Sequence, residues 1–146
     1  MAQNSANQLI GTLETQFVKL PPLPKTWRDI IVNVTPWIAL VFGVLGVLGS
    51  LAAFGFTAFF SPLIALGGGI GAATGGIIGS VLAFIASVLM VAAFPGTRAR
   101  KLSGWNLLFW SEVVSTVASV VAFSISGVVG ALIGFYILFQ IKSHYK

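Results

Sequence analysis

The chain has 146 residues, of which 57% are hydrophobic and only 8% are charged, and its net charge is +5. An average soluble domain has about 25% charged residues, so this composition excludes an ordinary soluble domain and predicts a membrane protein. The sequence contains no cysteine, which excludes disulfide bridges and thiolate metal sites.

Residues 1–35 predict a cytoplasmic segment in three parts. Apolar residues from Leu9 to Leu20 recur at helical spacing and predict a short amphipathic helix. Three prolines between residues 21 and 24 predict a stiff, extended spacer. From Trp27 to Val34 the apolar residues recur at i, i+3, i+4 and i+7, which is typical of a helix lying in the membrane interface.

Residues 36–141 predict a bundle of four transmembrane helices, the first two at about 37–60 and 70–94. The first run covers about 36 Å as a helix, which is enough to cross a hydrocarbon core of about 30 Å. Ser61-Pro62 is expected to break the chain between them. The glycine-dense segment 67–76 either protrudes as a helix or unwinds.

The second pair of spans is predicted at about 106–123 and 127–141. The apolar stretch that contains them is too long for one span, and polar and flexible residues at 124–127 favour a turn. The predicted fold class is therefore all-α, an integral membrane bundle of four transmembrane helices with amphipathic and interfacial helices at the N-terminus.

All eight basic residues fall on one side of this four-span arrangement. The positive-inside rule then places both termini, including a basic tail at 142–146, in the cytoplasm. Basic residues so placed attract anionic lipid headgroups, and we do not expect nucleic-acid binding because no folded basic surface would present it. The predicted headgroup residues are Lys19, Lys25, Arg28, Arg98, Arg100, Lys101, Lys142 and Lys146.

Small residues recur at short helical spacings in every predicted span. In lipid, such residues let two backbones approach closely and pack. They are Gly43, Gly46 and Gly49 in the first span; Gly67, Gly71, Gly75, Gly79, Ala83 and Ser87 at every fourth position before and within the second; Ser111, Ser115 and Ser119 in the third; and Ser126, Gly130 and Gly134 in the fourth. Two interpretations stay open: packing of the four spans within one chain, and contact between copies.

Glu112 is the one ionisable residue inside a predicted span, which makes it a functional-site hypothesis. Trp105 and Trp110 resemble interfacial residues, and Glu112 lies only about 3 Å deeper than Trp110 along a helix. It is therefore also explained as a shallow carboxylate that reaches the surface or pairs with Arg98, Arg100 or Lys101 of the basic loop at 98–101. If it points inward, Ser115 and Thr116 could complete a proton or cation site.

Two motifs resemble a group of small multi-spanning bacterial membrane proteins of unassigned function. They are SGWNLLFW at 103–110 and GFYILFQIKSHYK at 134–146. The resemblance implies a location in the bacterial inner membrane and a similar helical layout, and it implies no activity, substrate or cofactor.

The sequence predicts no enzyme, because no acid–base pair, metal cluster or activated nucleophile can be assembled from its residues. His144 has no partners at metal-ligand spacing, and we expect neither a metal nor a cofactor. We expect a structural or interaction protein that self-associates or joins another membrane subunit. The alternative is a proton or small-cation channel or transporter that uses Glu112.

Overall fold

Every regular element in the described part of the chain is helical. The structure is a computed structural model that describes residues 2–146, without the side chain of Ala2. Residue 1 of the predicted cytoplasmic segment lies outside the described residues. The predicted all-α class is confirmed for this range. The elements are α1 (Ala2–Phe17), α2 (Lys25–Arg98), α3 (Leu102–Val121), α4 (Ile125–Ile141) and the short 3-10 helix η1 (Lys142–His144).

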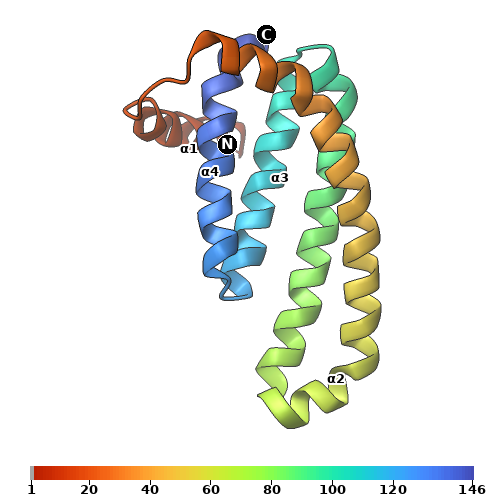
Figure 1. Cartoon of the computed structure of the whole chain (residues 1–146). Helices are drawn as coiled ribbons and strands as arrows, with labels where there is room; N and C mark the ends of the chain where they lie inside the picture. Colours follow the sequence, from red (N-terminus) through yellow and green to blue (C-terminus); the bar gives the residue numbers. More distant parts are fainter. Residues whose placement is uncertain (1) are drawn as a thin grey trace.

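The helix α2 folds back on itself as two arms (Figure 1). Its 74 residues would extend about 110 Å as one straight helix. The helical conformation is interrupted at Gly69, whose φ of 80° and ψ of 164° are non-helical and are accessible because glycine lacks a Cβ. The first arm (25–68) and the second arm (70–98) then lie side by side. A Cβ added to Gly43 would be only 2.8 Å from Val91 Cγ2.

The breaks within α2 differ from those expected at two of its prolines. The helix continues through Ser61 and Pro62, and the chain reverses at Gly69 instead. It also continues through Pro36, where a new helix was expected. The Thr35 hydroxyl donates to the Ile31 carbonyl at 2.6 Å, a bond inside one helix. A proline removes one backbone donor and can kink a helix without ending it, and Figure 1 shows α2 turning from across one end of the bundle to run along it.

The helices α3 and α4 form a second, shorter hairpin, which stops short of the reversal in α2 (Figure 1). The turn lies slightly earlier than expected. The Ser124 N–H donates to the Ser119 carbonyl at 2.8 Å, and Phe123 has a left-handed φ of 51°, which together close the end of α3. The Ser124 hydroxyl accepts from the Gly127 N–H at 3.2 Å and so caps α4. It also lies 3.3 Å from the Ser126 hydroxyl, which is exposed.

The hydrophobic core lies where the start of α2 meets α3 and α4. Trp105 and Ile141 are fully buried, and Phe109 is 1% exposed. Leu13 and Phe17 of α1 pack against this cluster. The Trp105 indole N–H donates to a carbonyl of α4 at 2.8 Å, so this tryptophan is a core residue rather than an interfacial one. A buried indole needs such a partner for its one polar group.

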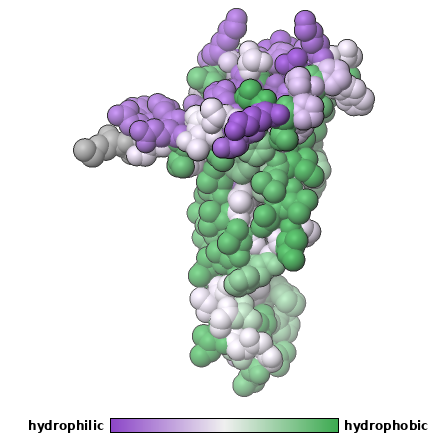
Figure 2. Space-filling view, turned by 90° about the vertical axis from the view of Figure 1, so that its left-hand side faces the viewer, coloured by the Kyte–Doolittle hydropathy of each residue, from purple (hydrophilic) through white to green (hydrophobic). Residues whose placement is uncertain are grey.

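Outside this core the bundle presents an apolar surface. Figure 2 shows apolar residues along the length of one face and hydrophilic residues gathered near one end. Among the described residues, two segments are long and apolar enough to span a membrane, Lys25–Arg98 and Ile125–His144. In the most apolar 18-residue stretch of each segment, only 17% and 22% of the residues are buried. The core helix of a soluble protein would be mostly buried.

Candidate functional site

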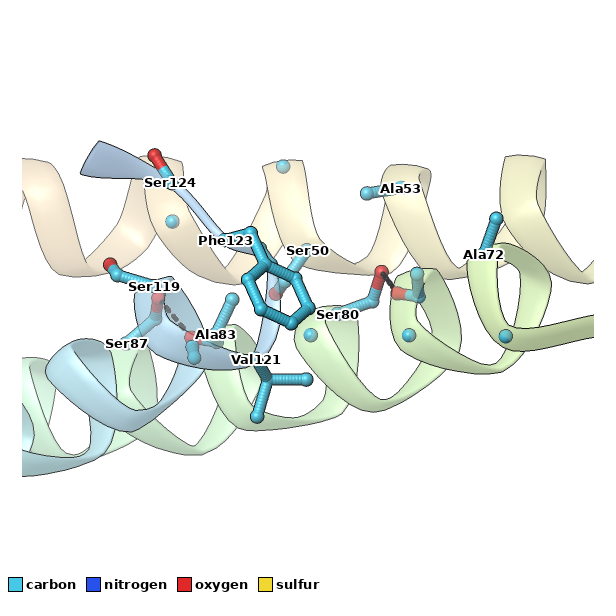
Figure 3. A pocket seen from close by; sticks show the side chains of 18 residues that line it. Ser50, Ala53, Ala72, Ser80, Ala83, Ser87, Ser119, Val121, Phe123 and Ser124 are labelled. Carbon is cyan, nitrogen blue, oxygen red and sulfur yellow. Dashed lines mark hydrogen bonds between the residues drawn. The ribbon is translucent and has the colours of Figure 1, made fainter. Parts of the chain in front are cut away.

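A cavity of about 940 Å³ opens between the two arms of α2 and the turn that joins α3 to α4. We call it the small-residue cavity. The arms extend beyond the α3–α4 turn (Figure 1), so that hairpin does not cover their small-residue faces. Figure 3 shows short side chains of both arms together with the Phe123 ring. The lining includes Gly46, Gly49, Gly71, Gly75, Gly76, Gly79, Ala83 and Ser87 from α2, and Ala118, Ser119, Phe123 and Ser124 from the turn side.

The glycines of α2 differ in what faces them. A Cβ added to Gly76 would lie 3.2 Å from Thr57 Cγ2 of the other arm, and one added to Gly46 would collide with Ser87. These glycines, together with Gly43, pack the two arms against each other. Several others meet no atom of another described segment within 4 Å of such a Cβ, and those predicted as packing residues are Gly49, Gly67, Gly71, Gly75 and Gly79.

Small residues of the second hairpin have mixed surroundings. The Ser111 hydroxyl donates to the Ala86 carbonyl at 2.8 Å and ties α3 to the second arm of α2. The Ser119 hydroxyl donates within α3 to the Ser115 carbonyl at 2.9 Å. A Cβ on Gly130 would meet no described atom within 4 Å beyond its own helix. Only part of the predicted small-residue set therefore packs within the chain.

A close backbone approach between α2 and α3 involves two glycines that the sequence analysis did not single out. A Cβ added to Gly96 in α2 would lie 2.6 Å from the Cα of Gly104 in α3. A Cβ on Gly104 would approach the Thr97 nitrogen more closely still. The two glycines flank the basic loop, and this symmetric placement on either side of a tight connection is the signal that could have revealed them.

Glu112 lies half-way along α3 and faces α4. A Cβ added to Gly134 would lie 2.7 Å from the Glu112 Cδ, so the missing side chain of Gly134 leaves the space that the carboxylate occupies. The carboxylate lines an apolar pocket of about 410 Å³ between the first arm of α2, α3 and α4. About 15 Å of helix separates it from the start of α3.

The predicted polar partners do not surround the Glu112 carboxylate. The Thr116 hydroxyl donates to the backbone carbonyl of Glu112 at 2.7 Å, not to the side chain. Within residues 2–146 the ion pairs join Lys142 to Glu14 and His144 to Asp29. Glu112 therefore has no cationic partner among the residues described.

Three chain segments that carry basic residues meet at one end of the bundle (Figure 1). They are the start of α2, the loop at 98–101 and the C-terminal tail. The Arg100 guanidinium donates to the Asn33 side-chain oxygen at 2.9 Å, and the Lys146 N–H donates to the Arg100 carbonyl at 3.0 Å. Lys142 pairs with Glu14 of α1 at 2.5 Å. Four other predicted headgroup residues are exposed, and they are Lys19, Lys25, Arg98 and Lys101.

In the part of the chain that the structure describes, no three His, Asp or Glu side chains gather closely enough to hold a metal ion. Comparisons of the chain with protein-family models, with curated proteins and with solved structures give no match. The resemblance carried by residues 103–110 and 134–146 stays a prediction, and the functional argument depends on the geometry described above.

Proposed function

We propose that the chain is an integral membrane protein that crosses the bilayer four times, through the two arms of α2 and through α3 and α4. The exposed apolar surface supports this, because Phe59 is 79% exposed, Leu66 is 86% exposed and Ile70 is 79% exposed. A soluble monomer rarely exposes so large a contiguous apolar surface. The resemblance implies the bacterial inner membrane as its location.

The distribution of charge supports an orientation with both termini in the cytoplasm. Basic residues gather at one end, and the opposite turns, around Gly69 and at 122–126, carry none. Short basic loops favour the cytoplasmic side. Each basic residue near the surface adds about 1 kcal/mol of attraction to anionic lipid.

Within the membrane, we assign the chain a structural or interaction role, as a bundle that self-associates or joins another membrane subunit. The observation that carries this proposal is the open face of Gly67, Gly71, Gly75 and Gly79. Helix association in lipid depends on close packing of small residues. These glycines have no partner segment among residues 2–146 within 4 Å of an added Cβ, so they leave a surface against which a second helix can pack.

Cysteine accessibility tests the orientation. Single cysteines in place of Ser5, Ser103 and Ser143 should react with a membrane-impermeant thiol reagent only from the cytoplasmic side. A cysteine in place of Ser126, at the opposite end, should react only from outside. Labelling of the Ser143 site from outside would exclude the four-span arrangement.

Leucine substitutions separate self-association from internal packing. Gly75→Leu and Gly79→Leu fill the open cavity, so each should lower the oligomeric fraction measured by native mass while the chain stays folded. Gly76→Leu should instead lower the unfolding temperature, because its side chain meets Thr57 of the same chain. Gly130→Leu is the matched control, since it makes the same change at an open glycine outside the cavity.

The outcome against this role is specific. If Gly75→Leu and Gly79→Leu keep the native mass of the wild-type protein, the open glycine face does not mediate assembly. If all four variants lower the oligomeric fraction and the unfolding temperature equally, the segment contributes glycine flexibility and not a packing face.

One observation favours a second candidate, a proton or small-cation channel or transporter. The Glu112 carboxylate lines the 410 Å³ pocket without a cationic partner among the residues described. Flux in reconstituted vesicles distinguishes the candidates. The structural role predicts equal proton leak in wild-type and Glu112→Gln vesicles, whereas a pH-dependent leak that only the wild type carries would make this a transport protein.

A further inference from the structure

A separate cavity of about 540 Å³ lies where α1, the start of α2 and the C-terminal end of the chain meet. We call it the junction cavity. Its polar lining includes Glu14, Arg28, Lys142 and Tyr145, and its apolar lining includes Phe17 and Phe139. Two of these segments, the start of α2 and the C-terminal end, carry basic residues, and all three lie at the same end of the bundle (Figure 1).

Two hydrogen-bond donors of this cavity have no partner in the described chain. They are the Nε of Arg28 and the phenol oxygen of Tyr145, and both atoms are buried. The Tyr145 side chain belongs to a residue that is only 4% exposed. A buried polar group without a partner is unfavourable, so two such donors among the residues that line one cavity indicate that something else accepts from them.

Neighbouring polar groups of the same region do have partners. The Tyr136 hydroxyl donates to the Pro21 carbonyl at 2.6 Å, and Gln140 Oε1 accepts from the Leu23 N–H at 3.3 Å. Lys142 is paired with Glu14. Among the polar side chains named here, the atoms without a partner are thus the Arg28 Nε and the Tyr145 hydroxyl oxygen.

The chemistry of the two donors selects an anion. Arginine presents a planar fork of N–H donors that matches phosphate or carboxylate oxygens. Burial raises the pKa of Tyr145, with Arg100 opposing the shift, so the phenol stays protonated and able to donate at neutral pH. The charges of Lys142 and Glu14 offset each other, which leaves the positive charge of Arg28 for the ligand.

We propose that the junction cavity binds a phosphate group through the Arg28 guanidinium and the Tyr145 hydroxyl, and that an acidic phospholipid supplies this phosphate. A bare phosphate would leave most of the cavity empty. The glycerol and upper acyl region of a lipid would contact Phe17 and Phe139. The choice of a lipid as the source depends on the membrane placement proposed above, whereas the phosphate site depends only on the two donors.

Lipid retention by the full-length protein in detergent tests this proposal. The probe is dioleoyl phosphatidylglycerol, counted per chain by native mass spectrometry, and dioleoylglycerol, which lacks the phosphate, is its control. Loss of a charge-assisted hydrogen bond should weaken retention about tenfold or more in Arg28→Gln, and loss of a neutral one about threefold in Tyr145→Phe. Lys25→Gln removes an equal charge from the same end of α2 but no donor of the cavity, so it should weaken retention by at most about fivefold, the general attraction of one surface charge.

Tyr145→Phe keeps the shape of the ring, so it tests the site even if Arg28→Gln fails to fold. Equal losses in Lys25→Gln and Arg28→Gln, or wild-type retention by Tyr145→Phe, would overturn the site. If millimolar inorganic phosphate displaces the lipid and raises the unfolding temperature of the protein as much as the lipid does, the assignment to a lipid fails. Native mass spectrometry also reports assembly in the same experiment. A wild-type protein that retains no lipid but keeps its oligomeric mass would therefore count against this site and not against the interaction role.

Discussion

Substitution of Gly104 by alanine tests the contact that joins α2 to α3. The added methyl group would collide with backbone atoms of Gly96 and Thr97, and its distance to the Gly96 Cα would be 2.8 Å. Backbone atoms cannot rotate away, so the two helices must separate. Overpacking of this kind costs about 1–3 kcal/mol, and the higher helix propensity of alanine recovers about 1 kcal/mol.

With the upper overpacking value of about 3 kcal/mol, less the gain of about 1 kcal/mol, Gly104→Ala should lower the free energy of unfolding by about 2 kcal/mol. The unfolding temperature should then fall by about 4–8 °C. Thermal unfolding in detergent, followed by near-ultraviolet circular dichroism, measures it through the adjacent and fully buried Trp105. Gly79→Ala is the matched control, because its methyl group meets open space and should leave stability unchanged or raise it. If the two variants unfold at the same temperature, α2 and α3 do not approach as described.

Three further predictions use the same unfolding assay. Phe123→Gly should raise the free energy of unfolding by about 1 kcal/mol, because glycine adopts the left-handed conformation of this position without strain. Phe123 is 93% exposed, so a loss of stability would mean that its ring packs in the folded protein. Trp105→Phe should cost about 1–3 kcal/mol, because it removes the buried donor to the Leu138 carbonyl, whereas a neutral effect would exclude that bond. Burial raises the pKa of Tyr145, partly offset by Arg100. The unfolded chain ionises first, so the free energy of unfolding should fall as pH rises above the ordinary value of 10.0, and Tyr145→Phe should reduce that fall.

The sequence predicted the class of the fold from composition and periodicity. Long uncharged runs require helices wherever lipid surrounds them, and the structure is helical in all its regular elements between residues 2 and 146. The end of α3 and the start of α4 were also predictable within a few residues, because Ser124 caps a helix through its side chain. The position of the chain reversal was not. Prolines and glycines both disturb helices, and only the folded chain shows that the helix passes Pro62 and reverses at Gly69.

The surroundings of the candidate sites were less predictable than their residue types. Spacing along a helix defines a face, but it does not say which segment covers that face. Gly76 touches the other arm of α2 while Gly75 and Gly79 face open space, although all three belong to one glycine-rich run.

By itself, the sequence determined an all-α chain with a membrane-like composition, one-sided positive charge and small-residue helix faces, because these properties depend only on residue type and order. Tertiary structure alone decided which faces are covered. The greater reach of the α2 arms leaves the glycine face open. The meeting of distant segments buries Trp105 and leaves the Arg28 Nε and the Tyr145 hydroxyl without partners in the described chain. Burial and unpaired donors depend on contacts between residues far apart in sequence, which no local pattern contains.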